Sequence, residues 1–360
     1  MKNDLATAMR RALGKTRALN TGQATAIIRE ALAGVPHMPP AGSAGIAPTA
    51  ARHESPFASL LRDGCRPCAG GGLMQGLNLP PRPGGEIRVP EGARYERRHH
   101  AGAAGSRNYT LYIPTDRPEG VRGLILMLHG CTQSPDDFAR GTRMNDAAEK
   151  AGYIVAYPEQ SRAHNMQSCW NWFRPEDQAR GQGEPGILAG IARDLLAEFD
   201  LPEGRAFVAG LSAGGAMAAI MTEAYPDLFA AAGVHSGLPA GAASDVTSAF
   251  AAMQGQGNAP IRQGPTPMIV FHGTADATVA PINGDRLVTA SGIETGHEGN
   301  GRRWSRLIAS NGSELWRVAQ AGHAWCGGDP AGSHTDPLGP DASTEMVRFF
   351  EEVSSTARGR

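Results

Sequence analysis

The feature that most constrains the fold is the alternation of short apolar runs with helix-like stretches between residues 95 and 360. The apolar runs have the length of buried strands and lie at 109–113, 124–128, 154–157, 206–209, 230–234, 268–271 and 315–318. The helix-like stretches lie at 146–151, 187–199, 213–225 and 343–353. Strands that alternate with helices form mostly parallel sheets covered on both faces. The sequence therefore predicts one α/β domain over residues 95–360, with a doubly wound sheet.

Two segments precede this domain. Residues 1–34 carry apolar residues at helical spacing and predict a helical hairpin. Its apolar side fits against the domain or a second copy of the chain, as in a homodimer. Alternatively it fits an apolar surface of another kind, with Arg10, Arg11, Lys15 and Arg17 beside it. Residues 35–94 read as a linker, because ten prolines and nine glycines occur within 36–90.

Charge and composition exclude several classes of protein. The 34 Lys and Arg residues balance 35 Asp and Glu residues, which leaves no basic excess to bind nucleic acid. No apolar run approaches the length of a membrane span, and none near Met1 resembles a signal peptide, so we expect a cytoplasmic protein. Cys65 and Cys68 form an isolated CxxC pair, and no metal cluster or phosphate loop stands out. We therefore expect neither a cofactor nor a metal.

The strongest local signal is the sequence Gly-Leu-Ser-Ala-Gly at 210–214, followed by Gly215. It directly follows the apolar run at 206–209 and opens the helix-like stretch at 213–225. In this strand–turn–helix context a GxSxG sequence holds its serine in a sharp turn at the carboxyl edge of a sheet. The alternative is a helix N-cap serine among packing glycines. The context favours Ser212 as a nucleophile.

A serine nucleophile needs a base, and the base needs a carboxylate that orients it. Asp276 follows the run at 268–271, and His323 follows the run at 315–318. Both lie where loops leave the carboxyl ends of strands, in the chain order serine, acid, histidine of α/β-hydrolases. The alternatives are a turn aspartate and a surface histidine, with His334 as the reserve base. We expect His129 and His272, each before a glycine at a strand end, to be structural.

An oxyanion hole requires two backbone N–H donors. The residue after the nucleophile, Ala213, provides one in this type of site. The second should come from an early loop after a strand, and the sequence His-Gly-Cys-Thr-Gln at 129–133 fits that place, with Cys131 as donor. The alternative is an ordinary turn with a glycine.

Aromatic residues and cysteines gather in the same predicted loops. Trp170, Trp172 and Trp325 lie in such loops, so we expect them to line a substrate pocket, the alternative being the core. Cys131 and Cys169 both belong to loops that meet this edge. A disulfide between them is open, but a cytoplasmic location argues against it.

Several motifs together resemble the poly(3-hydroxybutyrate) depolymerase family of esterases. They are the sequences at 129–133, 157–160, 169–173, 210–217, 322–325 and 339–343. The resemblance spans about residues 105–352 and extends to esterases of the feruloyl and acetyl-xylan types. It implies an α/β-hydrolase fold with Ser212 as nucleophile, Asp276 as acid, His323 as base, and Cys131 and Ala213 as oxyanion donors.

This resemblance implies an ester hydrolase for short-chain polyhydroxyalkanoates or their oligomers. A small-molecule carboxylesterase of the feruloyl or acetyl-xylan type is the alternative. A peptidase of the prolyl-oligopeptidase kind is less consistent, because no propeller-length region precedes the domain. A binding protein on a hydrolase scaffold would not need a serine, an aspartate and a histidine at three strand ends.

Overall fold

The computed structural model describes residues 87–257, 261, 264–289, 293–296 and 301–358. The chain divides into two units, Met1–Leu77 and Asn78–Arg360, and every described residue belongs to the second unit. The predicted hairpin at 1–34 and most of the predicted linker therefore lie outside the described residues.

The centre of the second unit is a ten-stranded sheet with the order β1-β2-β4-β3-β5-β6-β7-β10-β9-β8. Its strands are β1 (Arg94–Gly102), β2 (Gly105–Ile113), β3 (Gly123–Leu128), β4 (Tyr153–Pro158), β5 (Ala206–Leu211), β6 (Phe229–His235), β7 (Met268–Gly273), β8 (Ile293–Gly296), β9 (Trp304–Ile308) and β10 (Glu314–Val318). Strands β4, β3, β5, β6, β7 and β10 run parallel, and antiparallel strands flank them on both sides. A separate pair, β11 (Trp325–Cys326) and β12 (Thr335–Asp336), is also parallel.

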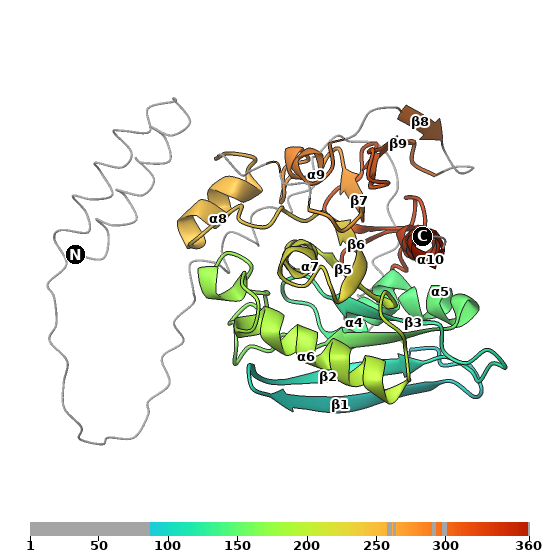
Figure 1. Ribbon diagram of the computed structural model, residues 1–360. Coiled ribbons are helices and arrows are strands. Elements are labelled where there is room, and N and C mark those ends of the chain that lie inside the picture. Colours follow the sequence, from blue (N-terminus) through green and yellow to red (C-terminus); the bar gives the residue numbers. More distant parts are fainter. Residues whose placement is uncertain (1–86, 258–260, 262–263, 290–292, 297–300, 359–360) are drawn as a thin grey trace, which may run out of the picture. The chain divides into compact units, whose positions relative to one another are not determined.

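Helices cover both faces of this sheet (Figure 1). They are α4 (Pro135–Thr142), α5 (Met144–Ala151), α6 (Gly183–Glu198), α7 (Ala213–Ala224), α8 (Val246–Met253), α9 (Ile282–Leu287) and α10 (Ala342–Arg358), with a short 3₁₀ turn at Pro175–Asp177. None of the described helices is both long and apolar enough to cross a membrane. Every predicted strand and helix of the domain is present, and the fold is that of an α/β-hydrolase.

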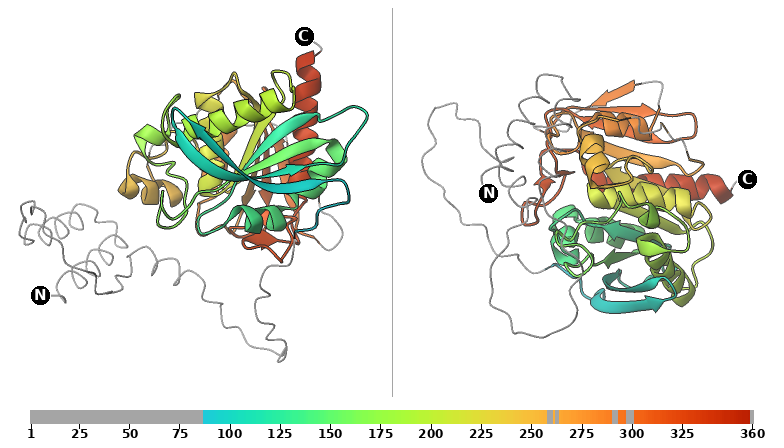
Figure 2. Two further views of the ribbon diagram at one scale, coloured as in Figure 1. Left: turned by 90° about the horizontal axis from the view of Figure 1, so that it is seen from below. Right: turned by 90° about the vertical axis from the view of Figure 1, so that its left-hand side faces the viewer.

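The two-residue period of the strands explains the two layers of core. In β3, Leu124, Leu126 and Leu128 face the side of the sheet that α6 and α7 cover. The intervening Ile125 and Met127 face the side covered by α4, α5 and α10. Figure 2 shows the sheet and the helices that cover it from two further directions. Because both faces are covered, β3 is buried over its whole length, as a central parallel strand should be.

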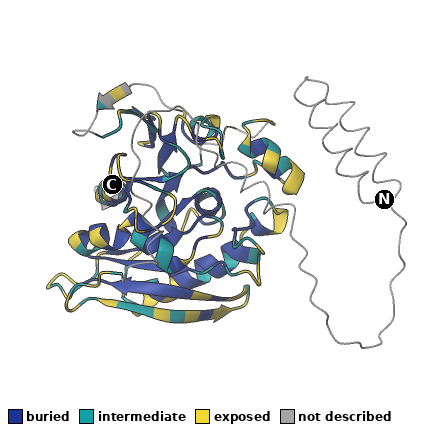
Figure 3. Cartoon of the chain, turned by 180° about the vertical axis from the view of Figure 1, so that it is seen from behind, coloured by how far each residue is buried: buried dark blue, intermediate teal, exposed yellow. Residues whose placement is uncertain are grey.

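The edge strand β1 has a different character (Figure 3). Its residues are mostly exposed or half-buried, and it carries Arg94, Glu96, Arg97 and Arg98. Charged side chains on an edge strand oppose pairing with another chain. The sheet is therefore apolar in its central strand β3 and charged at its edge strand β1, which meets solvent.

Sequence reasoning missed three helices, α4, α8 and α9, in segments that read as loops, and two of them have clear starts. Helix α4 begins after Ser134, whose hydroxyl accepts a hydrogen bond from Asp137 N–H at 3.2 Å, and Pro135 occupies its first turn. Helix α8 begins with a capping box, in which Asp245 and Ser248 each accept from the other's backbone N–H. Both starts are legible from the sequence as capping signals.

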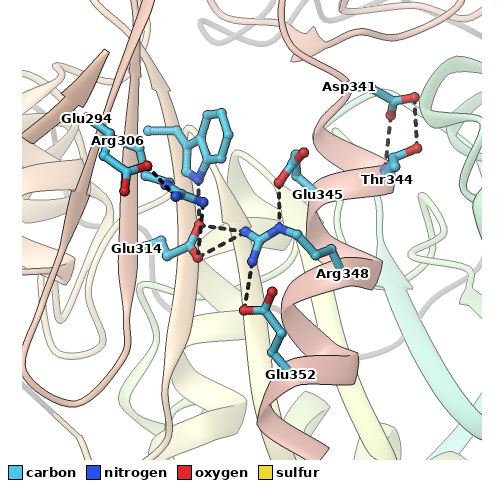
Figure 4. Close-up of polar contacts among 9 residues, drawn as sticks. Glu294, Arg306, Glu314, Asp341, Thr344, Glu345, Arg348 and Glu352 are labelled. Carbon is cyan, nitrogen blue, oxygen red and sulfur yellow. Dashed lines mark hydrogen bonds and ion pairs between the residues drawn. The ribbon is translucent and has the colours of Figure 1, made fainter. Parts of the chain in front are cut away.

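A polar cluster fixes the last helix to the sheet (Figure 4). Glu314 on β10 is only 4% exposed. Its carboxylate accepts hydrogen bonds from Arg348 of α10 at 2.8 and 2.9 Å and from the Trp316 indole at 2.8 Å. A buried carboxylate with these partners avoids the cost of an uncompensated charge. The contact holds α10 against β10, the strand that precedes His323.

Candidate active site

The turn between β5 and α7, residues 210–215, is here called the nucleophile turn. Ser212 has φ 58° and ψ −118°, which is an unusual conformation for a residue with a side chain. A Cβ atom on Gly214 would lie 2.0 Å from the Leu128 carbonyl oxygen, and one on Gly210 would lie 2.4 Å from Gly214. Only glycine fits at these two positions. The half-buried Ser212 is therefore held at the carboxyl end of β5, directly before the first turn of α7.

Asp276 and His323 come together at the same edge of the sheet. The loop after β10, residues 319–326, is here called the histidine loop. His323 Nδ1 donates to Asp276 Oδ2 at 2.8 Å, and Asp276 Oδ1 accepts from the N–H groups of Thr278 and Val279 at 2.9 Å. Burial opposes ionisation of Asp276, but the hydrogen bond and charge of His323 outweigh it and lower the pKa of the carboxyl. An ionised aspartate thus orients an imidazole that is 13% exposed.

The other histidines occupy different positions. The His334 ring lies edge-on to His323 at 6.5 Å between ring centres. The buried His129 donates from Nδ1 to the Gly130 carbonyl at 2.8 Å and accepts at Nε2 from Gln160 N–H at 3.1 Å. The buried His272 donates from Nε2 to the Val279 carbonyl at 2.9 Å. His129 and His272 therefore brace loops.

The loop after β3 approaches the nucleophile turn closely. A Cβ atom on Gly130 would lie 3.5 Å from the carbonyl oxygen of Leu211, which precedes the serine. Gly130 N–H donates to Gln133 Oε1 at 2.9 Å, so the loop folds back on itself. Cys131 and Ala213 thus sit on the two loops that meet between β3 and β5. The chain order of a doubly wound sheet reverses at this point, which is the usual ligand position.

Cys131 and Cys169 form a disulfide across 38 residues of sequence. Next to it, Thr132 N–H donates to the Gln167 carbonyl at 2.7 Å. The question that the sequence left open is therefore answered, because the two loops converge closely enough for the cysteines to pair. The disulfide fixes the backbone of Cys131 to the loop at 161–170.

Known proteins resemble this chain in sequence and in fold. The family model described as esterase PHB depolymerase matches residues 107–296, more than half of the chain. The chain belongs to this family. The curated relatives include the poly(3-hydroxyalkanoate) depolymerase C of Paucimonas lemoignei, which is 34% identical over 199 residues, 51% of this chain and 47% of that protein.

Two fungal relatives and one solved structure extend the comparison. A probable acetylxylan esterase A of Aspergillus clavatus is 30% identical over 48% of this chain and 61% of its own length. Feruloyl esterase B of Neurospora crassa is 32% identical over 38% of this chain and 47% of its own length. This chain thus spans about half the length of the curated relatives it matches. The structure of an acetyl xylan esterase from Aspergillus awamori shares the fold, with a TM-score of 0.56, 20% identity and coverage of 71% of this chain and 99% of that one.

The three tryptophans expected to contact substrate lie in the core of this esterase-family domain. Trp170 is 0%, Trp172 6% and Trp325 1% exposed. The indole N–H of Trp170 donates to the His129 carbonyl at 3.1 Å, and that of Trp325 to Ser343 Oγ at 3.1 Å. The indole N–H groups of Trp170 and Trp325 thus already have protein partners, and a substrate pocket lined by the three rings stays a prediction. They support the loops that carry Cys131 and His323.

A cavity of about 400 Å³ lies on the β1–β2 side of the sheet. Its walls come from both strands, from the start of α4 and from Glu159 after β4. Strands β4 and β3 separate β2 from β5 in the sheet order, so this cavity does not surround Ser212. Among the described residues, no group of three or more His, Cys, Asp or Glu side chains is arranged to hold a metal ion.

Sequence reasoning overlooked His235, the last residue of β6. Its carbonyl accepts from Ser212 N–H at 2.9 Å, and its Nε2 accepts from Cys326 N–H at 3.0 Å. The signal was available, since His235 ends an apolar run as His129 and His272 do. What the sequence could not supply was its second contact, with a residue 91 positions away.

Proposed function

We propose that this protein is a serine ester hydrolase that acts on short-chain polyhydroxyalkanoates or their oligomers. The observation that carries the proposal is the Asp276–His323 pair at 2.8 Å on the same sheet edge as Ser212 in its positive-φ turn. Membership of the esterase family supports the same chemistry. No hydrogen bond joins the described Ser212 and His323 side chains, and contacts of this kind often tighten only with substrate bound.

The geometry assigns a role to each group. Because the carboxylate of Asp276 only accepts, the proton of a neutral His323 sits on Nδ1, and Nε2 is left to take the proton of Ser212 Oγ. The serine oxygen then attacks the ester carbonyl. The N–H groups of Cys131 and Ala213, with the positive end of α7, stabilise the negative oxygen that forms.

Three further proton transfers complete the cycle. The protonated His323 gives its proton to the leaving alcohol, so the C–O bond of the ester breaks and an acyl-serine remains. Water then attacks the acyl-serine, with His323 as base, and Ser212 recovers its proton as the acid is released. No group outside this set is needed to balance the reaction.

The substrate class rests on the relatives. Similarity to a polyhydroxyalkanoate depolymerase favours a polyester as the substrate of this protein. Similarity to acetylxylan and feruloyl esterases favours an acetylated or feruloylated ester as the second candidate. Rates on amorphous poly(3-hydroxybutyrate), its soluble dimers and trimers, p-nitrophenyl butyrate, methyl ferulate and acetylated xylan separate them. We expect the highest kcat/KM on hydroxybutyrate oligomers or polymer. Preference for ferulate or acetylated xylan would replace the polyester proposal with the second candidate.

The role of residues 1–34 is a separate proposal. If they hold the enzyme on a polymer granule, deleting residues 1–93 should lower the rate on polymer more than the rate on p-nitrophenyl butyrate, because surface attachment raises the local concentration of the catalytic domain. If they instead pack on the domain or form a homodimer, both rates should change equally, with a change in stability or in molecular mass by size exclusion.

The cytoplasmic location stays a prediction. The disulfide between Cys131 and Cys169 counts against it, because disulfides persist mainly in oxidising compartments. Cell fractionation, with alkylation of free thiols in the recovered protein, would decide between the cytoplasm and an oxidising compartment.

A further inference from the structure

His235 lies between the nucleophile turn and the histidine loop. It ends β6, where it is opposite Leu211 of β5 on one side and Phe271 of β7 on the other. Leu211 directly precedes the nucleophile, and Phe271 belongs to the strand that leads to Asp276. The backbone of His235 thus occupies the centre of the edge at which all three proposed catalytic side chains arrive.

Two hydrogen bonds of His235 reach different loops. Its carbonyl accepts from Ser212 N–H at 2.9 Å, which fixes the nucleophile turn to β6. Its Nε2 accepts from Cys326 N–H at 3.0 Å, three residues beyond His323. Since a backbone N–H only donates, Nε2 must be unprotonated and the ring proton must lie on Nδ1, which is 3.2 Å from Ser236 Oγ. One residue therefore joins the two loops. Its contact with the histidine loop requires this tautomer of the ring.

The surroundings keep this imidazole in place and neutral. His235 is 0% exposed and stacks between Phe271, at 5.8 Å between ring centres, and Trp325, at 5.2 Å. Burial lowers its pKa to about 3, with the neighbouring His272 and His323 acting in the same direction. Its acceptor nitrogen is therefore available throughout the neutral pH range. Trp325 is two residues from His323, so the stacking also bears on the histidine loop.

We propose that His235 is a positioning residue, which sets the distance between Ser212 and His323 by bonding the nucleophile turn through its carbonyl and the histidine loop through its ring. This inference rests on the proposed function, because it assigns a role in that reaction. His235 does not touch the substrate. It acts through the placement of His323, so its loss should lower kcat and leave KM nearly unchanged.

The test compares substitutions that keep or remove the acceptor in the full-length protein. His235→Gln places an amide oxygen near the position of Nε2, whereas His235→Leu removes the acceptor and leaves Cys326 N–H buried without a partner. Phe229→Leu, at the buried opposite end of β6, is the control for lost packing. Rates on p-nitrophenyl butyrate are corrected for the folded fraction measured by circular dichroism.

We expect His235→Leu to lower kcat on the order of 10–100-fold, because a misplacement of about 1 Å costs about 100-fold. KM should stay within about threefold, and Phe229→Leu should keep its kcat. His235→Gln should recover kcat to within about fivefold of the wild type. A wild-type kcat in His235→Leu, or equal losses in His235→Leu and Phe229→Leu, overturns the proposal.

Two further variants keep the test decisive. If His235→Leu does not fold, His235→Asn replaces it, because the shorter amide does not reach the position of Nε2. Equal kcat values in the Gln and Asn variants would then overturn the role of the acceptor. Ser212→Ala separates this proposal from the proposed function. An active Ser212→Ala removes the serine mechanism itself, whereas an inactive one together with a fully active His235→Leu removes only the positioning role.

Discussion

The nucleophile turn and the histidine loop reach the same sheet edge by different kinds of contact. The nucleophile turn is determined locally, by glycines at 210 and 214 that allow no side chain and by a serine with φ 58°. The histidine loop is held from a distance, through Asp276, His235 and the pairing of β11 with β12. A short motif can thus specify the position of the nucleophile, whereas the position of the base depends on the whole fold.

The largest effect should come from the nucleophile itself. Ser212→Ala should lower kcat by about 10⁶-fold, because the loss of a triad nucleophile leaves only binding and the oxyanion site. The melting temperature should change little, since the Ser212 side chain caps no helix. Turnover on p-nitrophenyl butyrate and a thermal melt check both parts. A folded variant with near wild-type turnover would rule out Ser212.

The base gives the next largest effect and tests the distant region. His323→Ala should lose at least about 10⁴-fold in kcat, because His323 is the imidazole bonded to Asp276. His334→Ala is the matched control, since its ring lies 6.5 Å from that of His323, and it should stay within about tenfold of the wild type. The reverse order of activities would identify His334 as the base.

Glycine substitutions compare the two regions directly. Gly214→Ala places a Cβ atom 2.0 Å from the Leu128 carbonyl oxygen and should lower the free energy of unfolding by about 3 kcal/mol or more. Gly322→Ala, beside His323, meets no atom within 4 Å and should change it by less than about 1 kcal/mol. Urea unfolding measures both. Equal effects would contradict the local character of the nucleophile turn.

These contrasts explain how far the sequence could be interpreted. The parallel strands, the helices α5, α6, α7 and α10, the GxSxG turn and the strand ends that carry Asp276 and His323 follow from local patterns. The burial of the tryptophans does not follow from them, because Trp325 lies in a predicted loop and is covered by the distant residues Ser343 and His235. The disulfide and the second contact of His235 join residues 38 and 91 positions apart, and no local pattern contains such a pairing.

The disulfide provides a further way to perturb the sheet edge at which Ser212 and His323 lie. Reduction should free the backbone of Cys131 from the loop at 161–170 and lower kcat by about tenfold, because oxyanion donors must be held in place. The free energy of unfolding should fall by about 4 kcal/mol if the loop-entropy model for 38 residues applies. Cys131→Ala with Cys169→Ala should reproduce both losses and abolish the response to dithiothreitol. Continued sensitivity to reductant in the double variant would point to another cysteine.

Acid should weaken this edge of the sheet, because buried neutral histidines lie in it, among them His129 on the loop after β3 and His235 against the histidine loop. Burial lowers the pKa of His129 to about 4 and that of His235 to about 3, well below the unfolded value of about 6.5. Between these values the unfolded chain binds more protons than the folded one, so stability is retained above pH 6.5 and lost as the pH falls. Each histidine contributes a slope of about 1.4 kcal/mol per pH unit.

Glu184 acts in the opposite direction over part of this window. Burial, reinforced by the charge of Asp177, raises its pKa to about 7, so the folded state binds the extra proton between about pH 4.5 and 7. Over pH 5 to 7, where both groups are partly titrated, Glu184→Gln should therefore steepen the loss of stability on acidification by about 1 kcal/mol per pH unit, whereas His235→Gln should reduce it by about the same amount. Phe229→Leu should lower the stability equally at every pH. Urea unfolding at pH 5, 6 and 7 measures the slope of stability against pH for the wild type and the three variants. If His235→Gln leaves the wild-type slope unchanged, the expectation of a neutral imidazole at position 235 is wrong.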